Sequence, residues 1–146
     1  MKVVVFDDDP TGSQTVHKTL LLLEWDVDVL RHGLRHPSPL LFLLVNTRAL
    51  MPEAVDKRIR QISHLLKEAI ALEGIDSKEL IFVSRGDSTL RGHGVLEPKV
   101  ISEELGPFAA TLHIPAFIEG GRTTVEGVHL LNGVPVHETH FAKDHF

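Results

Sequence analysis

The stretch that decides the fold is KVVVFDDDPTG, which runs from Lys2 to Gly12. Its first half is β-branched and aromatic, a composition typical of a buried β-strand. Acidic residues, proline and glycine follow at once, and such residues end a strand and favour a turn. The sequence therefore predicts a strand over Lys2–Phe6 that opens into a polar loop.

Short apolar runs recur along the chain and predict further strands. The clearest is Leu40–Val45, a continuous run of the kind found in strands that are covered on both faces. Thr19–Leu23 and Leu80–Val83 are shorter runs of the same type. A last apolar run, Leu112–Ile114, precedes a segment that is rich in Gly, His and Thr.

Two segments between these runs have signals of helices. From Pro52 to Glu73, apolar residues recur every three or four positions, with proline at the start and Gly74 after the end. Val95–Leu105 is a second helical segment, and it is stopped by Gly106-Pro107. We therefore expect two helices, of which the first has the stronger signals.

Alternation of strands, loops and helices indicates an α/β fold. We expect a three-layer, Rossmann-like domain, with a mostly parallel sheet that carries helices on both faces. A length of 146 residues suits one domain, and no linker, repeat or low-complexity tract divides residues 1–146. Because the last segment reads like the middle of a domain, we expect the domain to be incomplete at its carboxyl end.

Composition limits the classes of protein. With 42% hydrophobic and 24% charged residues, the chain is expected to be globular. Its apolar runs are far shorter than the roughly 20 residues that cross a bilayer, and no leader opens it, so we expect a cytoplasmic protein without a membrane segment. The absence of cysteine excludes disulfides and thiol nucleophiles. A net charge of −5 without a basic run gives no reason to expect nucleic acid as a partner.

The segment that follows Leu80–Val83 concentrates groups that bind a small anion. Arginine can hold a carboxylate or phosphate with two hydrogen bonds, and backbone N–H groups at a helix start carry partial positive charge. An ordinary capped turn is the alternative interpretation. The adhesion tripeptide Arg85-Gly86-Asp87 carries no weight in a cysteine-free chain. The candidate ligand-binding side chains of this segment are Arg85, Asp87, Ser88, Thr89 and Arg91.

Three consecutive carboxylates, Asp7, Asp8 and Asp9, follow the first strand. One of them could act as a general base, bind a polyol hydroxyl or hold Mg²⁺. Adjacent carboxylates repel one another, so the arrangement costs stability unless cations or hydroxyl donors neutralise it. A purely structural turn is the alternative.

Two other loops carry an arginine. Arg48 lies just past the run Leu40–Val45, and Arg122 and Thr123 follow two glycines. Both loops have donors for an anion, but a surface arginine and a glycine-rich turn account for them equally well.

The ten histidines raise the question of a metal site, most of all His137 and His140 with His145 close behind. Their spacing matches no zinc signature, and polar histidines near a chain end are usually solvated. We therefore expect no metal site.

Taken in order, four short elements of the chain resemble the four-carbon acid sugar kinases. The element of eight residues is the most specific, and the four are spread over most of the chain. Pro10 departs from the leucine of many members but keeps the acidic and Thr-Gly frame. The elements are Asp8-Asp9-Pro10-Thr11-Gly12, Asn46-Thr47-Arg48, Arg85-Gly86-Asp87-Ser88-Thr89-Leu90-Arg91-Gly92 and Gly121-Arg122-Thr123-Thr124.

The resemblance implies an amino-terminal α/β domain that binds a hydroxylated four-carbon acid such as threonate, erythronate or an oxo-tetronate. It further implies that ATP and Mg²⁺ bind a separate carboxyl-terminal domain and that a substrate hydroxyl is phosphorylated between the two domains. Asp8 or Asp9 would orient or deprotonate that hydroxyl. The other expected substrate contacts are Arg48, Arg85, Asp87, Ser88, Thr89, Arg91, Gly92, Arg122 and Thr123.

Length is the main departure from this family. Its substrate domain normally continues beyond the position of Phe146, and its nucleotide-binding domain is absent from these 146 residues. We therefore expect the chain alone to carry no cofactor and no kinase activity, and to need the nucleotide-binding domain as a partner. An incomplete sheet also leaves an uncovered edge or apolar face, so we expect a homo-oligomer.

Two other functions stay open. Val3–Thr11 fits the hydrophobic-Asp-x-Asp-x-Thr opening of haloacid-dehalogenase-type phosphatases, in which Asp7 would be the nucleophile. The acidic pair that such an enzyme requires after a later strand is not found. The third hypothesis is a non-catalytic remnant that at most binds a sugar acid.

Overall fold

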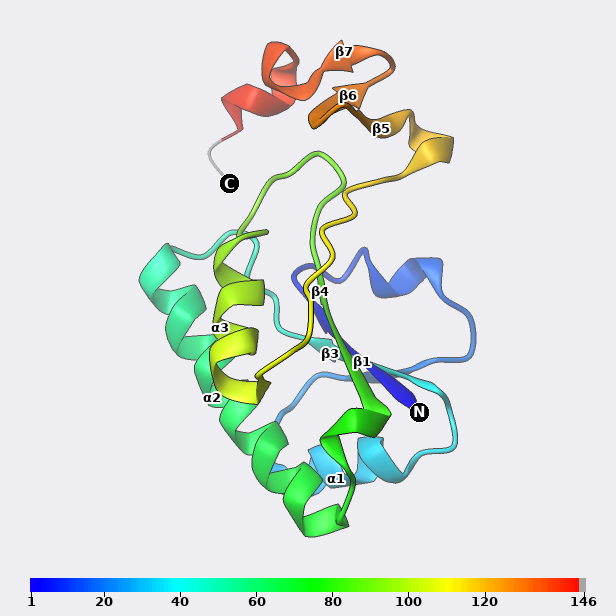
Figure 1. The fold of residues 1–146 in the computed structure, drawn as a ribbon, viewed down its shortest axis with the longest axis vertical. Coiled ribbons are helices and arrows are strands. Elements are labelled where there is room, and N and C mark those ends of the chain that lie inside the picture. Colours follow the sequence, from blue (N-terminus) through cyan, green and yellow to red (C-terminus); the bar gives the residue numbers. More distant parts are fainter. Residues whose placement is uncertain (145–146) are drawn as a thin grey trace.

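A four-stranded parallel sheet forms the centre of the protein (Figure 1). The structure is a computed structural model that describes residues 1–144. The strand order is β2-β3-β1-β4, so β1 is central and the sheet confirms the expected α/β class. The strands are β1 (Lys2–Asp7), β2 (Leu20–Leu22), β3 (Leu40–Leu44) and β4 (Leu80–Arg85).

Three α-helices accompany the sheet, and the sequence analysis predicted two of them. α2 (Pro52–Glu73) has the predicted bounds, because Pro52 opens its first turn and Gly74 ends it in the left-handed conformation with φ of 65°. α3 (Leu96–Leu105) starts one residue later than predicted. α1 (Val27–Arg35) was missed, although the Asp26 side chain caps it by accepting a hydrogen bond from the backbone N–H of Val29.

All three helices pack on the same face of the sheet, where the sequence analysis expected helices on both. The handedness of the crossover connections explains this arrangement. The connections β2–α1–β3 and β3–α2–β4 move along the sheet in one direction, and right-handed crossovers then place both helices on one face. The connection from β1 to β2 moves in the opposite direction, but its helical content is a single 3₁₀ turn, Ser13–Thr15.

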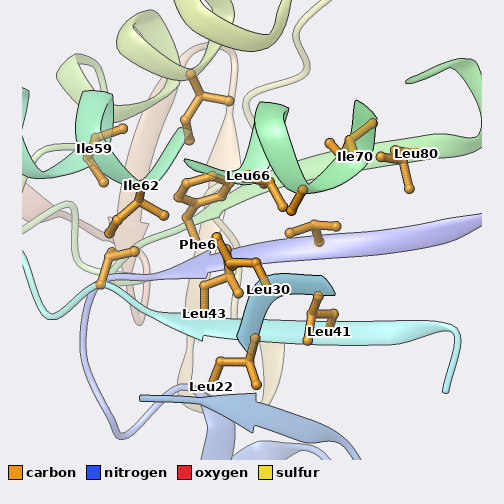
Figure 2. Close-up of a cluster of buried hydrophobic side chains, with 14 of the residues drawn as sticks. Phe6, Leu22, Leu30, Leu41, Leu43, Ile59, Ile62, Leu66, Ile70 and Leu80 are labelled. Carbon is orange, nitrogen blue, oxygen red and sulfur yellow. The ribbon is translucent and has the colours of Figure 1, made fainter. Parts of the chain in front are cut away.

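The core fills the space between this face and the helices (Figure 2). Phe6 of the central strand points towards Leu66 of α2, and Leu41 and Leu43 of β3 point to the same side. Alternation along each strand explains this, since every second residue faces the helices. The side chains Val4, Phe6, Leu30, Leu41, Leu43, Ile59, Ile62 and Leu66 are fully buried.

Gly33 allows α1 to approach the sheet closely. A Cβ atom at this position would lie 2.9 Å from Cδ1 of Leu22 and 2.9 Å from Cδ1 of Leu41. We expect Gly33→Ala to lower the free energy of unfolding by about 1 kcal/mol, because overpacking of about 1–3 kcal/mol outweighs the gain in helix propensity. Urea unfolding checks this, with Gly94→Ala as the control, since its Cβ would meet no atom within 4 Å. A stabilised Gly33→Ala variant would contradict the prediction.

A second, antiparallel sheet occupies the carboxyl-terminal part of the described chain. Its strands are β5 (Arg122–Val125), β6 (Val128–Leu131) and β7 (Val134–Pro135), in the order β5-β6-β7. In Figure 1 this sheet lies beyond the loop that follows β4, away from the three helices. Both hairpin turns have positive φ at their two central residues, which is the type I′ arrangement. These turns are Glu126-Gly127 and Asn132-Gly133.

An extended segment joins α3 to this second sheet. The apolar run Leu112–Ile114 lies in it and forms no strand. Leu112 and Ile114 are 81% and 75% exposed. No helix of residues 1–144 is both long enough and apolar enough to span a membrane.

Candidate functional site

The carboxyl ends of β1, β3 and β4 meet at one edge of the sheet, and the polar loops of the sequence meet with them. Asp7 is in register with Leu44 on one side and with Arg85 on the other. Asp8 follows the end of β1 directly, and Arg48 lies four residues past the end of β3. Parallel strands therefore bring together side chains from three distant parts of the chain.

Asp8 and Arg48 form the centre of this cluster. The Arg48 guanidinium donates two hydrogen bonds to the Asp8 carboxylate, from Nε at 2.9 Å and from Nη2 at 2.8 Å. The Asp8 side chain is 1% exposed. The backbone N–H groups of Thr47 and Arg48 donate to the Asp8 carbonyl at 3.0 and 3.2 Å, so main chain and side chains fix the same pair.

Asp9 lies at the more open side of the cluster. Its Oδ1 accepts hydrogen bonds from the backbone N–H and the hydroxyl of Thr11, and its Oδ2 lies 3.4 Å from Nη1 of Arg48. Burial alone would raise the pKa of Asp9, but the Thr11 hydrogen bonds and the charge of Arg48 lower it below its usual value. Asp9 is therefore a carboxylate at neutral pH, and its side chain is 26% exposed.

Asp7 and Arg85 are close without being hydrogen-bonded. Asp7 is fully buried, and neither of its carboxylate oxygens accepts a hydrogen bond from another side chain of the described chain. Arg85 Nη1 lies 3.6 Å from Oδ1 of Asp7 and 3.8 Å from Oδ1 of Asp8. Burial raises the pKa of Asp7 to about 6, although the charge of Arg85 opposes this. Gly12 covers the pair, and a Cβ there would collide with Asp7 Oδ1 and lie 2.7 Å from the Arg85 guanidinium.

The loop after β4 forms a second set of contacts beside the first. Asp87 accepts hydrogen bonds from the hydroxyl of Thr89 and from Nε of Arg91, the latter at 2.7 Å. Burial would raise the pKa of Asp87, but these hydrogen bonds and the charges of Arg91 and Arg48 lower it. Gly92, with φ of 83°, passes so close that a Cβ there would lie 3.3 Å from the Asp8 carboxylate.

Arg122 lies apart from the Asp8–Arg48 pair. Its guanidinium lies 5.9 Å from the ring centre of Phe141, and the Arg91 guanidinium lies 5.2 Å from the same ring. The two arginines thus stack on one aromatic side chain. Thr123 belongs to β5, where it is in register with Leu130. The structure therefore joins Arg122 to the loop of Arg91 through Phe141, but not directly to the strand ends.

Several residues of the cluster were not singled out from the sequence. Glu97 of α3 is buried, and it accepts hydrogen bonds from the hydroxyls of Thr47 and Ser84.

Two further residues contact the loop after β4. Asp144 binds Nη1 of Arg91 at 3.0 Å. His129 of β6 hydrogen-bonds the Ser88 carbonyl through Nε2 at 2.6 Å, which ties the second sheet to the loop after β4. Only Glu97 had a usable signal, because helical spacing places it on the apolar face of α3 with Val100 and Ile101.

The three arginines of the cluster differ in the hydrogen bonds that they donate to carboxylates of the chain. Arg48 and Arg91 each donate hydrogen bonds to carboxylates of the chain itself. Arg85 donates none to a carboxylate of residues 1–144, and its Nη1 is buried without a hydrogen-bond partner. The Arg85 side chain is 32% exposed, so the part of its guanidinium that faces away from Asp7 and Asp8 can bind an incoming anion.

The carboxyl-terminal histidines make local contacts. His137 lies 3.8 Å from Glu138, and His140 packs against Phe141 with 4.0 Å between ring centres. His145 lies outside the described residues. Within residues 1–144, no three His, Asp or Glu side chains gather in a way that could hold a metal ion.

A parallel α/β sheet with arginines and carboxylates at its carboxyl edge is the arrangement typical of domains that bind a small polar ligand. The chain belongs to the family described as the sugar-binding N-terminal domain, whose model matches residues 3–146. It is also 29% identical over 150 residues to D-erythronate kinase of Heliobacterium modesticaldum, covering 97% of this chain and 32% of that enzyme.

Solved structures with the same fold come from Bordetella bronchiseptica. Two crystal forms of a domain of unknown function, a domain-swapped dimer with bound citrate, match with a TM-score of 0.78 and 25% identity. The match covers 99% of this chain and 36% or 37% of those chains. The chain thus spans about a third of the length of the relatives it matches.

Proposed function

We propose that this chain is the substrate-binding part of an ATP-dependent kinase that phosphorylates a four-carbon sugar acid of the erythronate or threonate type. The observation that carries the proposal is the guanidinium of Arg85, which lies among the strand ends on a side chain that is 32% exposed and donates no hydrogen bond to a carboxylate of residues 1–144. The relationship to a D-erythronate kinase supports the choice of ligand, as does the citrate, a hydroxylated acid, bound to the Bordetella protein.

In this proposal Arg85 binds the carboxylate of the sugar acid. Arg48 and Arg91 contribute positive charge, but the carboxylates that they already bind fix their side chains. Asp87, Ser88 and Thr89 are placed on one loop, where carboxylate and hydroxyl oxygens are suited to the hydroxyl groups of a sugar acid. Gly92 keeps that loop close to Asp8, and Arg122 and Thr123 contact the substrate from the second sheet.

Asp9 is the better of the two expected catalytic carboxylates. Both oxygens of Asp8 are occupied by Arg48, whereas Oδ2 of Asp9 has only a longer contact of 3.4 Å. Asp9 can therefore orient the attacking hydroxyl and accept its proton as phosphoryl transfer proceeds. Asp8 contributes by holding Arg48 in place.

ATP and Mg²⁺ belong, in this proposal, to the part of the kinase outside this chain. The donor set of the strand ends does not fit a resident Mg²⁺, because the oxygens of Asp8 are already bound by Arg48 and Asp7 is covered by Gly12. The nucleotide-binding domain is the expected partner of this chain.

Removal of the Arg85 guanidinium tests the proposal. We expect Arg85→Ala to weaken binding of erythronate or threonate roughly ten- to thirtyfold, since a hydrogen bond to a charged group contributes about 1.5–2 kcal/mol. Arg85→Lys keeps the charge but not the paired donors, and it should recover part of the affinity. Isothermal titration calorimetry measures both, with Arg60→Ala on α2 as the control. Failure of the folded wild-type chain to bind any four-carbon acid would contradict the proposal.

The phosphatase alternative is not favoured by the position of Asp7. An aspartyl nucleophile must reach the phosphorus atom of its substrate, but the Asp7 carboxylate is fully buried beneath Gly12. The non-catalytic remnant is the outcome if a well-folded chain shows no binding.

Self-association remains a prediction. The extended segment between α3 and β5 carries the exposed apolar side chains Leu112, Ile114 and Ile118. Such a row favours contact with another apolar surface. Light scattering at high protein concentration measures it.

A further inference from the structure

A buried carboxylate of the cluster has no part in the function proposed above. Glu97 lies in the first turn of α3 and is 2% exposed. Its two oxygens accept hydrogen bonds from different strand ends, one from the hydroxyl of Thr47 and one from the hydroxyl of Ser84 at 3.1 Å. No arginine or lysine of residues 1–144 forms an ion pair with it. Burial raises the pKa of Glu97, although the two hydroxyls oppose this.

Such a group needs an explanation, because a buried carboxylate without a cation is costly. A leucine or methionine would fill the same space on the apolar face of α3 without that cost. Unlike these apolar side chains, the carboxylate accepts two hydrogen bonds and so links two segments of the chain. It joins the loop that follows β3 to the end of β4, and β1 lies between these two strands in the sheet.

Each hydroxyl that Glu97 holds is adjacent in sequence to an arginine of the cluster. Thr47 precedes Arg48, and its own backbone N–H donates to the Asp8 carbonyl at 3.0 Å. Ser84 precedes Arg85 in β4. A displacement of Thr47 would move Arg48 relative to Asp8, and a displacement of Ser84 would move Arg85 relative to Asp7.

We infer that Glu97 is a positioning residue of the sugar-acid site, which holds Arg48 and Arg85 at a fixed separation through the hydroxyls of Thr47 and Ser84. The inference rests on the proposed function for its consequence in binding, but the positioning itself does not depend on any ligand. Glu97 touches neither arginine, so its effect passes through its two neighbours.

Two variants separate positioning from a merely structural role. Glu97→Gln keeps the shape of the side chain but cannot accept both hydroxyl protons with equivalent oxygens, and Glu97→Leu accepts neither. Loss of positioning should weaken binding of erythronate about fivefold in Glu97→Gln and about twentyfold in Glu97→Leu. The free energy of unfolding of Glu97→Gln at pH 7.5 should equal or exceed that of the wild type, because a costly buried charge is removed. A structural role alone would predict the opposite pattern, with stability lost and affinity per folded molecule retained.

Thr47→Val and Ser84→Ala remove the two partners one at a time. In a double-mutant cycle, the loss of affinity in Thr47→Val should be largely absent when Glu97 is already leucine. Glu103→Gln is the matched control, since it makes the same carboxyl-to-amide change on the outer surface of α3. Its affinity should equal that of the wild type.

A second measurement needs no ligand. The Nε–H of Arg48 is hydrogen-bonded to Asp8, and its exchange with solvent is measurable by nitrogen-15 NMR. Exchange should become about tenfold faster in Glu97→Leu and Thr47→Val and stay unchanged in Glu103→Gln. Unchanged exchange and unchanged affinity in folded Glu97→Leu would overturn the inference. If the wild-type chain binds no four-carbon acid, the proposed function fails, and the exchange rate alone decides whether Glu97 holds Arg48.

Discussion

Replacement of Arg48 by alanine should lower the free energy of unfolding by about 3–5 kcal/mol. The reason is the partner that remains, because Asp8 is 1% exposed and would keep a buried charge without its guanidinium. Urea unfolding at pH 7.5, followed by the fluorescence of Trp25, measures the change. Affinity for a sugar acid should fall as well, since Asp8 and Asp9 lose the guanidinium that holds their carboxylates in place.

A double-mutant cycle measures how much the interaction between Asp8 and Arg48 contributes to the free energy of unfolding. Asp8→Ala combined with Arg48→Ala should cost less than the sum of the two single changes, since neither charge is then left unpaired. Arg60→Ala is the control, because Arg60 makes its three ion pairs in solvent and is 40% exposed. Its removal should cost much less than that of Arg48. Strict additivity at Asp8 and Arg48 would show that the pair does not stabilise the strand ends.

Asp7→Asn should stabilise the protein at pH 7.5 by about 3 kcal/mol. Burial raises the pKa of Asp7 to about 6 from the ordinary 3.8, a difference of about two units at 1.36 kcal/mol each. A raised pKa means that the folded protein prefers the protonated group. Its stabilising contribution is therefore complete below pH 4 and lost as the pH rises through 6.

The pH dependence makes the test specific. Wild-type stability should fall between pH 4 and pH 7, and the fall should be smaller in Asp7→Asn, so that the two proteins differ little at pH 4. Glu68→Gln is the control, since it makes the same carboxyl-to-amide change at an exposed position of α2. A variant that is less stable than the wild type at both pH values would show that Asp7 is held by its neighbour Arg85 rather than merely buried.

The four parallel strands and the long helix could be predicted from the sequence, because their signals are local, although β4 ends at Arg85, two residues after the predicted Val83. Proline, apolar periodicity and glycine define α2 at both ends. The end of β1 is defined by the change from Phe6 to Asp8. Once the sheet is taken as parallel, the meeting of Asp8, Arg48 and Arg85 follows from topology alone.

Other features depend on packing that no local pattern encodes. α1 has nine residues, and only Leu30, Gly33 and Leu34 of these are buried, so its periodicity is short. The side of the sheet on which the helices lie depends on the order of the strands, which periodicity does not give. The hairpin turn at Asn132-Gly133, in contrast, could have been predicted, because Asn-Gly is a recognised local signal of a hairpin.

The partners of the arginines could not be predicted either. The sequence analysis expected Arg48, Arg85 and Arg91 all to contact the substrate. The geometry shows Arg48 and Arg91 already bound to carboxylates of the chain, which leaves Arg85 as the open one. Whether an arginine is hydrogen-bonded to a carboxylate depends on small differences in the distance between them, and residue spacing in the sequence does not give these distances.

The central place of β1 in the sheet has a consequence for synthesis on the ribosome. β1 precedes the other strands along the chain, but Lys2 pairs with Leu80. One edge of β1 therefore has no partner strand until β4 has been synthesised. In that interval Val3, Val4 and Val5 form a β-branched segment of which one backbone edge is unpaired. Nascent chains that stall before β4 should therefore recruit chaperones, and the charged residues Asp7, Asp8 and Asp9 directly after the segment are placed to limit its aggregation.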